Sequence, residues 1–537
     1  MAEQKEKVKK ILERFDKMRG KRAIWEDHWQ TLADYYIPNK NNIWRVDFPG
    51  TRKFSHLFDS TGMHAAELLG GALHGMLTSP NLLWFELTTG EPELDKRDDV
   101  RIWMDKTRVK MHETFNQSNF QEQIHEIYLD MVIFGTACLF MEEDEELLVR
   151  FKAIPIKEFF IEENARGLVD TVYREFDMTG KQILEKFGDS DAIDAECKRF
   201  LEAKRDEDHK ICHAVYPRSE YNDKSLNPKD YPVGSCYILK EKGKELSESG
   251  FKEFPFAVPR WSKVSGETYG RSPAMTALPD VRMVNEMMKV TLKGAQKVVD
   301  PPIMLPDDGF VLPVKLTPGG VNYYRAGSAD RIEPFANDAR IDFGQQVMED
   351  VRMRIKQAFF VDQLKLIENR PEMTATEVLQ RSEENLRLLG PMTGRQNNEL
   401  LRVLIDRTFA MHLRANALPP IPEVLSGKKV DVRYSSMVAK AQRVSEIQNI
   451  TRTLEVAAPF IQADPAVRDN LNGDEALRYV AKSFGAPQEI LNSLDRVNEI
   501  RQSRAEAQQE LAEQQRQQAE ADVADTAASA VSQVASV

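Results

Sequence analysis

The sequence predicts an α+β protein in which helices predominate. Long amphipathic stretches recur along the chain, and the clearest of them runs from Pro273 to Asp300. Between residues 136 and 262, by contrast, short apolar runs alternate with polar turns, which favours antiparallel strands. With 537 residues, the chain is long enough for several subdomains around more than one core.

Composition limits what the protein can do. Basic residues number 73 and acidic residues 85, which gives a formal net charge of −12. A protein that wraps DNA tightly is normally basic, so strong nucleic-acid binding by the whole surface is not expected. An acidic surface is still compatible with DNA that has to slide past it, because like charges prevent sticking.

The four cysteines indicate neither a metal site nor a disulfide framework. No Cys-x-x-Cys occurs, and a reducing cytoplasm is the simple interpretation. The polar N-terminus does not resemble a signal peptide. The uncharged stretch from Leu68 to Phe85 is interrupted by glycines and a proline, so we interpret it as a buried helix and a turn rather than a membrane span.

The first half of the chain is expected to mix helices and strands. Residues 1–38 favour a helix with a local excess of lysine and arginine, in which Trp25 and Trp29 lie one turn apart. That basic arm is either a solvated helix face or a contact with an acidic neighbour subunit, a shell protein or DNA. Further helices are expected at 59–78, 95–135 and 179–206, and strands at 136–141, 147–153, 158–161, 168–177 and within 211–262, with an acidic turn at Glu142–Glu146.

The clearest single element is a long helix that begins near Pro273 and ends before Pro301 and Pro302. Proline suits a first helical turn and a proline pair forces a stop, whereas Pro279 either kinks the first turns or marks the true start. About 28 residues at 1.5 Å each give a length of roughly 42 Å. Apolar residues recur at the spacing of a helix packed on one side, at Ala274, Leu278, Val281, Val284, Met288, Leu292, Ala295 and Val299.

After this helix the sequence predicts a small insertion and a second long helix. Residues 301–336 are rich in proline and glycine and favour a hairpin. Residues 340–360 favour a helix whose apolar stripe includes Val351 and Ile355. Residues 361–373 are then expected to form a loop.

The remaining residues are expected to be helical. Thr374 caps a very long helix that reaches about Ala415 and is kinked at Gly390-Pro391. Residues 437–500 favour shorter helices. From about residue 501 the chain is rich in glutamine and alanine, which indicates either a disordered tail or a helix that needs partners.

Short strings along the chain follow the order seen in one protein family. Each string is weak alone, but their common order over most of the chain argues against chance. On this basis residues 10–445 resemble the head–tail connector, or portal, proteins of short-tailed (podovirus-type) tailed phages. The strings are Asp34-Tyr35-Tyr36-Ile37-Pro38, Phe58-Asp59-Ser60-Thr61, Leu77-Thr78-Ser79-Pro80, Val172-Tyr173-Arg174, Gly270-Arg271-Ser272-Pro273, Asp300-Pro301-Pro302 and Met373-Thr374-Ala375-Thr376-Glu377-Val378.

The resemblance implies the portal fold and a ring of about twelve subunits at one capsid vertex. The residue patterns alone predict the same succession of long helix, small insertion, second helix, loop and kinked helix, and this agreement strengthens the assignment. The boundaries that it implies are an N-terminal α/β wing at 1–268, a first stem helix at 269–300, a clip at 301–336, a second stem helix at 337–360, a tunnel loop at 361–373, a long kinked wing helix and return strand at 374–436, a helical crown at 437–500, and a tail or barrel helix at 501–537.

The function implied by the resemblance is that of a portal protein, the channel for packaging and ejection of double-stranded DNA. The implied partners are further copies of the chain, DNA, the terminase packaging motor, the tail adaptor or tail tube protein, scaffold and major capsid protein, and internal core proteins, with no membrane and no cofactor. The implied location is the capsid vertex of the virion, and the host cytoplasm during assembly. The alternative is a helical scaffold or adaptor protein without a DNA channel.

Candidate channel residues are the cations on the two long helices. They form either a solvated face with intrahelical pairs, such as Glu286 with Lys289 at about 0.2–0.5 kcal/mol, or rings of positive charge that touch phosphates. The DNA-facing candidates are Lys289, Lys293, Lys297, Arg352 and Lys356; those of the tunnel loop are Lys365 and Arg370; those of the clip are Asp307, Asp308, Lys315 and Arg331. By resemblance the loop narrows the tunnel and the clip docks the motor and then the tail, whereas the plainer interpretation of the loop is an ordinary connection.

No pattern indicates an enzyme. The chain lacks Gly-x-x-x-x-Gly-Lys-Ser/Thr, so it is not itself an ATP-driven motor, and the common dinucleotide, zinc-protease and serine-hydrolase motifs are also absent. No carboxylate pair stands out for acid–base chemistry. His64, Glu67 and His74 fall in one helical region, but a packed helix with scattered histidines is the favoured interpretation. We expect no catalytic residue, metal site or cofactor.

Overall fold

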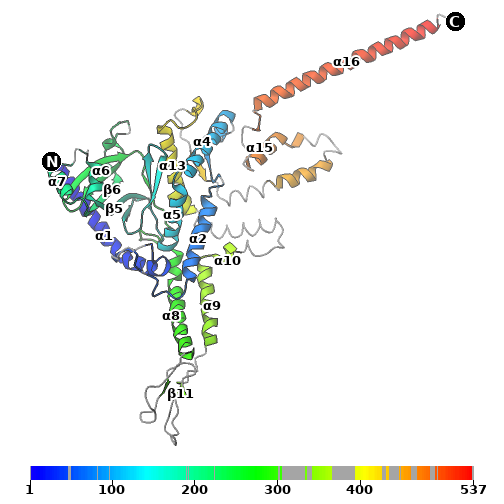
Figure 1. Cartoon of the computed structure of the whole chain (residues 1–537). Coiled ribbons are helices and arrows are strands. Elements are labelled where there is room, and N and C mark those ends of the chain that lie inside the picture. Colours follow the sequence, from blue (N-terminus) through cyan, green and yellow to red (C-terminus); the bar gives the residue numbers. More distant parts are fainter. Residues whose placement is uncertain are drawn as a thin grey trace. The chain divides into compact units, whose positions relative to one another are not determined.

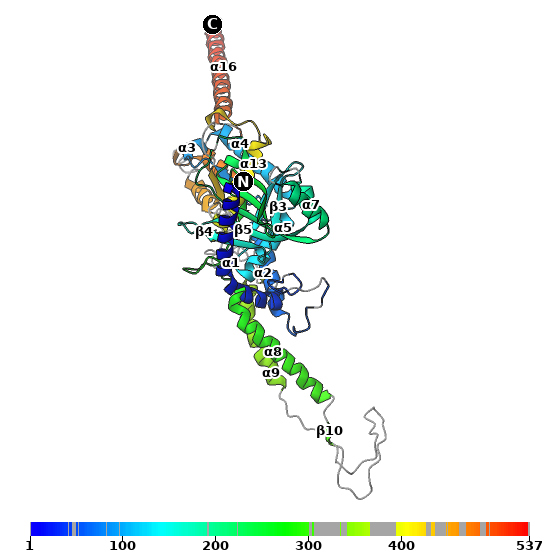
Figure 2. The same cartoon turned by 90° about the vertical axis from the view of Figure 1, so that its left-hand side faces the viewer.

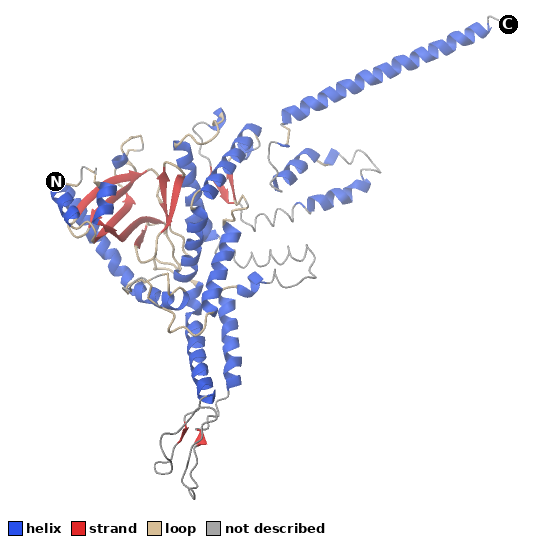
Figure 3. Ribbon diagram, viewed as in Figure 1, coloured by secondary structure: helices blue, strands red, loops and turns tan. Residues whose placement is uncertain are grey.

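The computed structural model describes residues 2–299 apart from short gaps, and residues 303–304, 333–334, 341–365, 394–425, 431–434, 447–460 except 448, 469–483, 490–492 and 494–534. It contains both helices and sheets, and helix predominates, as the sequence predicts (Figure 3). The chain divides into two compact units. Unit 1 comprises residues 1–84 and 111–416, and unit 2 comprises residues 85–110 and 417–537.

The largest sheet of unit 1 is antiparallel and has the strand order β4-β5-β6-β7-β8. Its strands follow each other along the chain with two helices between β5 and β6, so each strand pairs with its neighbour in sequence. The bounds are β4 Phe159–Glu163, β5 Val169–Thr179, β6 Asp208–Pro217, β7 Val233–Leu239 and β8 Lys244–Phe251. These strands confirm the alternating pattern seen in the sequence.

Helix α1 (Ala2–Tyr36) covers one face of this sheet (Figure 1). Phe15 is fully buried and lies edge-on against Phe160, with ring centroids 4.8 Å apart. Cys212 and Ala214 belong to the same core cluster, because alternate residues of β6 point to the same face. The apolar side of α1 is therefore used for packing. Most of its basic residues are exposed, but Arg22 is buried and donates to the Phe159 carbonyl at 2.6 Å.

Two short helices cover the opposite face, α6 (Gly180–Phe187) and α7 (Ala195–Ala203). The sequence predicts a helix that opens at Thr179, and this is confirmed. The Thr179 hydroxyl accepts a hydrogen bond from the Gln182 backbone, and the Gln182 side chain accepts one from the Thr179 backbone, which is a capping box. The single helix expected over 179–206 is nevertheless two helices.

A smaller sheet has the order β3-β2-β9, formed by β2 Leu139–Asp144, β3 Leu148–Ala153 and β9 Phe256–Ala257. The acidic turn expected at Glu142–Glu146 is misplaced by about two residues. Pairing continues to Asp144 opposite Leu148, and the Asp144 carboxylate then accepts hydrogen bonds from the backbone of Glu146 and Leu147, both at 3.0 Å. Asp144 therefore ends the strand, because its side chain satisfies the turn.

Buried helices back the smaller sheet. The expected helix over 95–135 is two helices, α4 (Asp98–Gln117) and α5 (Phe120–Phe134), separated by Ser118 and Asn119. Apolar residues of α5 such as Ile124 and Met131 are fully buried, and α5 packs against α2 (Thr61–Leu77).

Two long antiparallel helices extend from the body of unit 1, α8 (Pro273–Val299) and α9 (Ile341–Ala358) (Figures 1 and 2). Both were predicted from apolar periodicity. Pro279 lies inside α8, so Pro273 is the true start. Beyond their ends, β10 (Ile303–Met304) pairs with β11 (Glu333–Pro334). The predicted hairpin between these strands lies outside the described residues.

The predicted loop at 361–373 is wrong for its first residues, because Val361–Lys365 form helix α10. Phe359 and Val361 are buried, so packing continues past the end of α9. Most of the following long helix, including the expected cap and kink, lies outside the described residues. Its described part consists of residues 394–396, the π-helix η2 (Asn397–Leu401) and α13 (Arg402–Arg414).

Unit 2 combines a small two-stranded sheet with helices. Strand β1 (Phe85–Thr88) pairs with β12 (Asp431–Tyr434), and the Trp103 indole donates to the Pro419 carbonyl at 3.0 Å. The other bounds in this unit are α3 Pro92–Asp95, η3 Glu423–Leu425, α15 Gly473–Ser483 and α16 Leu494–Val534. Helix α16 resolves the two interpretations of the C-terminal residues in favour of a helix.

Candidate functional site: the α8–α9 helix pair and its anchors

Ser272 begins helix α8 and ties it to α5. Its hydroxyl donates to the Ile133 carbonyl at 2.7 Å and accepts from the Met275 N–H at 3.0 Å. The second contact satisfies a backbone donor that has no partner within the helix. Pro273 follows in the first turn, where a missing N–H costs nothing. The Gly-Arg-Ser-Pro string is thus a helix start.

Gly270 makes possible a close crossing of two backbone segments. A Cβ on Gly270 would lie 2.3 Å from the Gly135 carbonyl oxygen, and a Cβ on Gly135 would lie 2.3 Å from the Gly270 oxygen. Gly135 also has a φ of 77°, which L-residues rarely adopt. The Gly270 N–H donates to the Thr136 hydroxyl at 2.7 Å. No side chain fits at either position, so the base of α8 is fixed by backbone contact.

Aromatic residues hold the same region against α1. The Tyr269 ring lies edge-on to Trp29, with centroids 5.0 Å apart, and near Trp25 at 5.9 Å. The Arg271 guanidinium stacks over Trp25 at 4.6 Å. The Tyr36 hydroxyl donates to the Ala274 carbonyl at 3.0 Å. The tryptophans that the sequence places one turn apart therefore form a platform for the start of α8.

Both helices of the pair also form hydrogen bonds with residues 56–59, the segment that precedes α2. The buried Asn285 of α8 accepts from the Phe58 N–H at 2.7 Å and donates to the His56 carbonyl at 3.0 Å. Arg352 of α9 donates two hydrogen bonds to one Asp59 oxygen, at 2.9 and 2.7 Å. Burial opposes ionisation of Asp59, but hydrogen bonds from Thr61 and the Arg352 charge together lower its pKa.

The pair is well packed only near its base. Val284 is fully buried, as are Ile355 on α9 and Phe359 just after its end. In the outer half, however, Leu292 is 41% exposed and Val299 is 85% exposed, although both belong to the apolar stripe read from the sequence. The outer part of that stripe is thus only partly covered by the described residues of the chain. Exposed apolar residues gathered on one element are typical of an interaction surface.

The predicted DNA-facing cations fall into two groups. Lys289 donates to both Glu286 oxygens at 3.2 Å, which is the intrahelical pairing considered from sequence, and Arg352 is held by Asp59. Lys293 and Lys297 are exposed on the outer half of α8, and Lys356 is partly exposed. The structure therefore brings the lysines of α8 onto one exposed face but gives Arg352 an anchoring role that its sequence does not reveal.

Most of the other predicted site residues lie outside the part of the chain that the structure describes. Lys365 is the last residue of α10, and its side chain lies outside the described residues. Arg370 lies outside them as well, as do the four candidate clip contacts Asp307, Asp308, Lys315 and Arg331.

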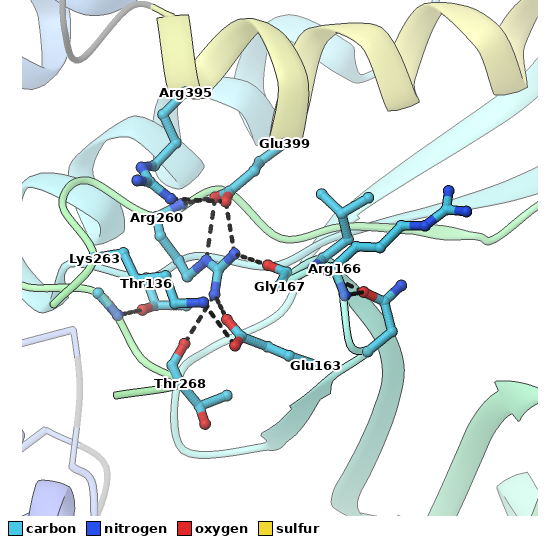
Figure 4. Close-up of polar contacts among 12 residues, drawn as sticks. Thr136, Glu163, Arg166, Gly167, Arg260, Lys263, Thr268, Arg395 and Glu399 are labelled. Atoms are coloured by element: carbon cyan, nitrogen blue, oxygen red, sulfur yellow. Dashed lines mark hydrogen bonds and ion pairs between the residues drawn. The ribbon is translucent and has the colours of Figure 1, made fainter. Parts of the chain in front are cut away.

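A buried ionic cluster around Arg260 was not predicted (Figure 4). Arg260 is fully buried and pairs with two carboxylates, Glu163 at the end of β4 and Glu399 in the π-helix η2. Its side chain also donates to the carbonyls of Gly167 at 3.1 Å and Thr268 at 3.2 Å. Burial would lower the pKa of Arg260, but the carboxylates of Glu399 and Glu163 raise it above its usual value.

The π-helix η2 and the residue before it, Gln396, also bind the backbone of Arg260. Glu399 accepts from the Arg260 N–H at 3.0 Å, and Gln396 donates to the Arg260 carbonyl at 3.0 Å. Lys263 and Arg395 complete the cluster as second partners of the two carboxylates, at 2.7 and 3.2 Å. The cluster thereby joins three chain segments that are far apart in sequence, and the segment that contains Arg260 leads to α8. No local pattern signals this, because each residue is an isolated charge in its own segment.

The structure offers little for metal or redox chemistry. Among the described residues, no group of three or more histidine, cysteine or acidic side chains could hold a metal ion. His64 lies 3.7 Å from Glu67 on an exposed helix face, while His74 instead contacts Gln121 at 2.8 Å. All four cysteines are unbonded and buried. Within the described part of the chain, no helix is long and apolar enough to span a membrane.

A rigidly anchored helix pair with exposed apolar residues defines a protein of the assembly class, which acts by contacting other chains. Comparison with known proteins gives the family. A family model described as bacteriophage head to tail connecting protein matches residues 8–491. The chain therefore belongs to the head to tail connecting proteins of bacteriophages, which makes it a structural portal protein and not an enzyme.

The relatives cover nearly the whole chain. It is 31% identical over 516 residues to the probable portal protein of Bordetella phage BPP-1, covering 95% of this chain and 93% of that protein. It is 30% identical over 510 residues to the portal protein of Salmonella phage epsilon15, covering 93% and 91%. A solved chain from the neck of an empty GTA (gene transfer agent) particle has 11% identity and a TM-score of 0.37, covering 78% of this chain and 92% of that one.

Proposed function

We propose that this chain assembles into a closed ring of about twelve copies at one capsid vertex, with a central channel through which double-stranded DNA enters and leaves. The observation that carries the proposal is the half-covered α8–α9 pair. Its outer apolar residues are largely exposed among the described residues, and repetition of the pair around an axis would cover them. The portal relatives support the same arrangement.

In this proposal α8 and α9 are the stem helices of the ring. Residues 1–268 form the wing, and residues 301–336 form a clip that docks the packaging motor first and the tail afterwards. The segment that follows α10, up to residue 373, acts as a tunnel loop that retains packaged DNA. Residues 437–500 form a crown, and the described helix α16 continues it at the C-terminal end. Scaffold and major capsid protein are the partners during assembly in the host cytoplasm.

Lys293 and Lys297 are the best candidates for contact with DNA, because both are exposed on one face of α8 and have no ion-pair partner among the described residues. Repeated around a ring, they would form a basic belt on an otherwise acidic protein. Such weak contacts guide DNA without stalling it, since affinity grows with each phosphate that is neutralised. Replacing both lysines with glutamine should weaken the salt dependence of DNA passage, and the paired Lys289→Gln should change it less.

Electron microscopy of the purified protein tests the proposal. End-on views should fall into one rotational symmetry class with a central hole wide enough for duplex DNA. A helical adaptor without a channel would instead give monomers, dimers or filaments at every protein and salt concentration. If those species persisted after scaffold protein was added, the ring proposal would be wrong.

A further inference from the structure

Helix α8 carries a second apolar ridge that is largely exposed. Met283, Val290 and Val298 are 41%, 65% and 50% exposed. With Met287 and Gly294 between them they follow one another at steps of four or three residues, so all five lie on one helix face. Helix α9 borders this ridge on one side, because Gly344 of α9 approaches Thr291, which follows Met287 by one helical turn. Met283 and Val290 are the ridge residues farthest from that contact around the helix.

The exposed side of α9 matches this face in apolar character and carries the opposite charge. Met353 is 54% exposed, and it lies opposite the buried residues Val351 and Ile355. Asp350 precedes it by three residues and is exposed on the same face. This side of α9 therefore presents one apolar and one acidic side chain.

Unpaired charges of opposite sign accompany the two faces. Arg282, next to the ridge of α8, and Asp350 are both exposed, and neither has an ion-pair partner among the described residues. Several other charges on the helix pair are matched within the chain, such as Arg354 with Asp280 at 3.3 Å. Arg282 and Asp350 thus remain available to a partner.

The two faces lie at the same height along the helix pair. The Arg354–Asp280 contact and the approach of Gly344 to Thr291 fix the antiparallel alignment. Met353 is then level with residues 281–282. Asp350 is level with residues 284–285, within about 4 Å of Arg282 along the axis at 1.5 Å per residue.

We infer that the inner part of α8 with Arg282 and Met283 packs against the α9 face with Asp350 and Met353 of the neighbouring copy, below the level of Lys293 and Lys297. The inference rests on the proposed ring. In a closed ring with the helix pair roughly parallel to the symmetry axis, equivalent residues of all copies lie at one height, so faces that match in height meet. The contact is heterologous, with Met283 against Met353 and Arg282 paired with Asp350 across the boundary.

Cross-linking between single-cysteine copies tests the apolar contact. Met283→Cys copies and Met353→Cys copies are mixed, assembled and treated with a short bismaleimide, which tolerates a wider range of separations than a disulfide does. The four native cysteines are buried and do not compete. The mixture should give covalent dimers, whereas each variant alone, and Met283→Cys mixed with the exposed control Lys17→Cys, should give few. Dimer yields at the control level in assembled rings would overturn the inference.

A charge exchange tests the ionic contact. Arg282→Glu and Asp350→Arg should each reduce the fraction of rings, the double variant should restore it, and Lys21→Glu on α1 should leave it unchanged. Equal ring fractions for all variants, or a double variant no better than the singles, would contradict the inference. In that case the wild type still forms rings and the proposed function stands. If the wild type forms no rings even with scaffold, both proposals fail.

Discussion

Replacement of Glu399 with alanine should release the helix that begins with η2 from the Arg260 cluster. Glu399 accepts three hydrogen bonds from Arg260, from its backbone N–H at 3.0 Å, from Nε at 3.2 Å and from Nη2 at 2.6 Å. Without the carboxylate, the fully buried guanidinium retains Glu163 as its one acidic partner. The variant leaves a buried charge and a backbone donor poorly satisfied.

The expected cost follows from burial. Removing one partner of a buried ion pair typically costs about 3–5 kcal/mol. Since Glu163 remains, we expect the lower end, about 3 kcal/mol, which corresponds to roughly 150-fold in an opening equilibrium. Hydrogen exchange of residues 396–405 measures that opening directly, without the assumption that a chain with two units unfolds in one step.

An exposed pair of the same chemistry provides the control. Glu267 pairs with Arg271, whose side chain is 46% exposed. Because solvent screens such pairs, Glu267→Ala should cost less than about 1 kcal/mol and leave exchange at 396–405 unchanged. Wild-type exchange rates in Glu399→Ala, or equal effects of the two variants, would refute the idea that the cluster anchors this helix.

Three further predictions concern the base of α8 and the cysteines. Gly270→Ala should lower the melting temperature sharply or prevent folding, because its Cβ would lie 2.3 Å from the Gly135 oxygen. The control Gly20→Ala has open space around it and should raise the free energy of unfolding by up to about 1 kcal/mol. Equal melting temperatures of the two variants would contradict this. The pKa of Asp59 is lowered on folding, so its ionised form contributes stability above the ordinary aspartate range near pH 4, and that contribution is lost as pH falls through the lowered value. Thermal unfolding should show wild type more stable than Asp59→Asn at pH 7, with a gap that shrinks below pH 4; a constant gap would speak against the pair with Arg352. Burial raises the pKa of the Cys212 thiol to about 12 and also raises the pKa values of the other three thiols. A thiol reagent at pH 8 should therefore modify no cysteine in the native protein and all four after denaturation. Rapid modification of the native protein would refute the burial of the cysteines.

Periodicity was sufficient to predict the elements that bury one face. The apolar stripes of α8 and α9 are local signals, and the structure contains both helices. Element boundaries that depend on single side chains were harder to predict from the sequence. The Asp144 side chain bonds the turn, so the acidic turn begins later than predicted. Residues after Phe359 stay packed, so the first residues of the expected loop form helix α10.

The anchors of the site depend on contacts that no local pattern encodes. In the sequence Arg352 is one of several cations at helical spacing, but in the structure its partner is Asp59, which is 293 positions away. Arg260 and Glu399 are 139 positions apart. Sequence reasoning could place charges on helix faces, but it could not distinguish a cation that is free to contact DNA from one that holds the fold together.

Vertex-focused cryo-electron microscopy of DNA-filled particles, reconstructed without imposed symmetry, tests the central claim most directly. The account predicts a ring of this chain at a single vertex, with its α8–α9 pairs surrounding duplex density on the axis and Lys293 and Lys297 facing it. A particle that carries the chain at every vertex, or a ring whose axis is closed or lined by other elements of this chain, would contradict the account.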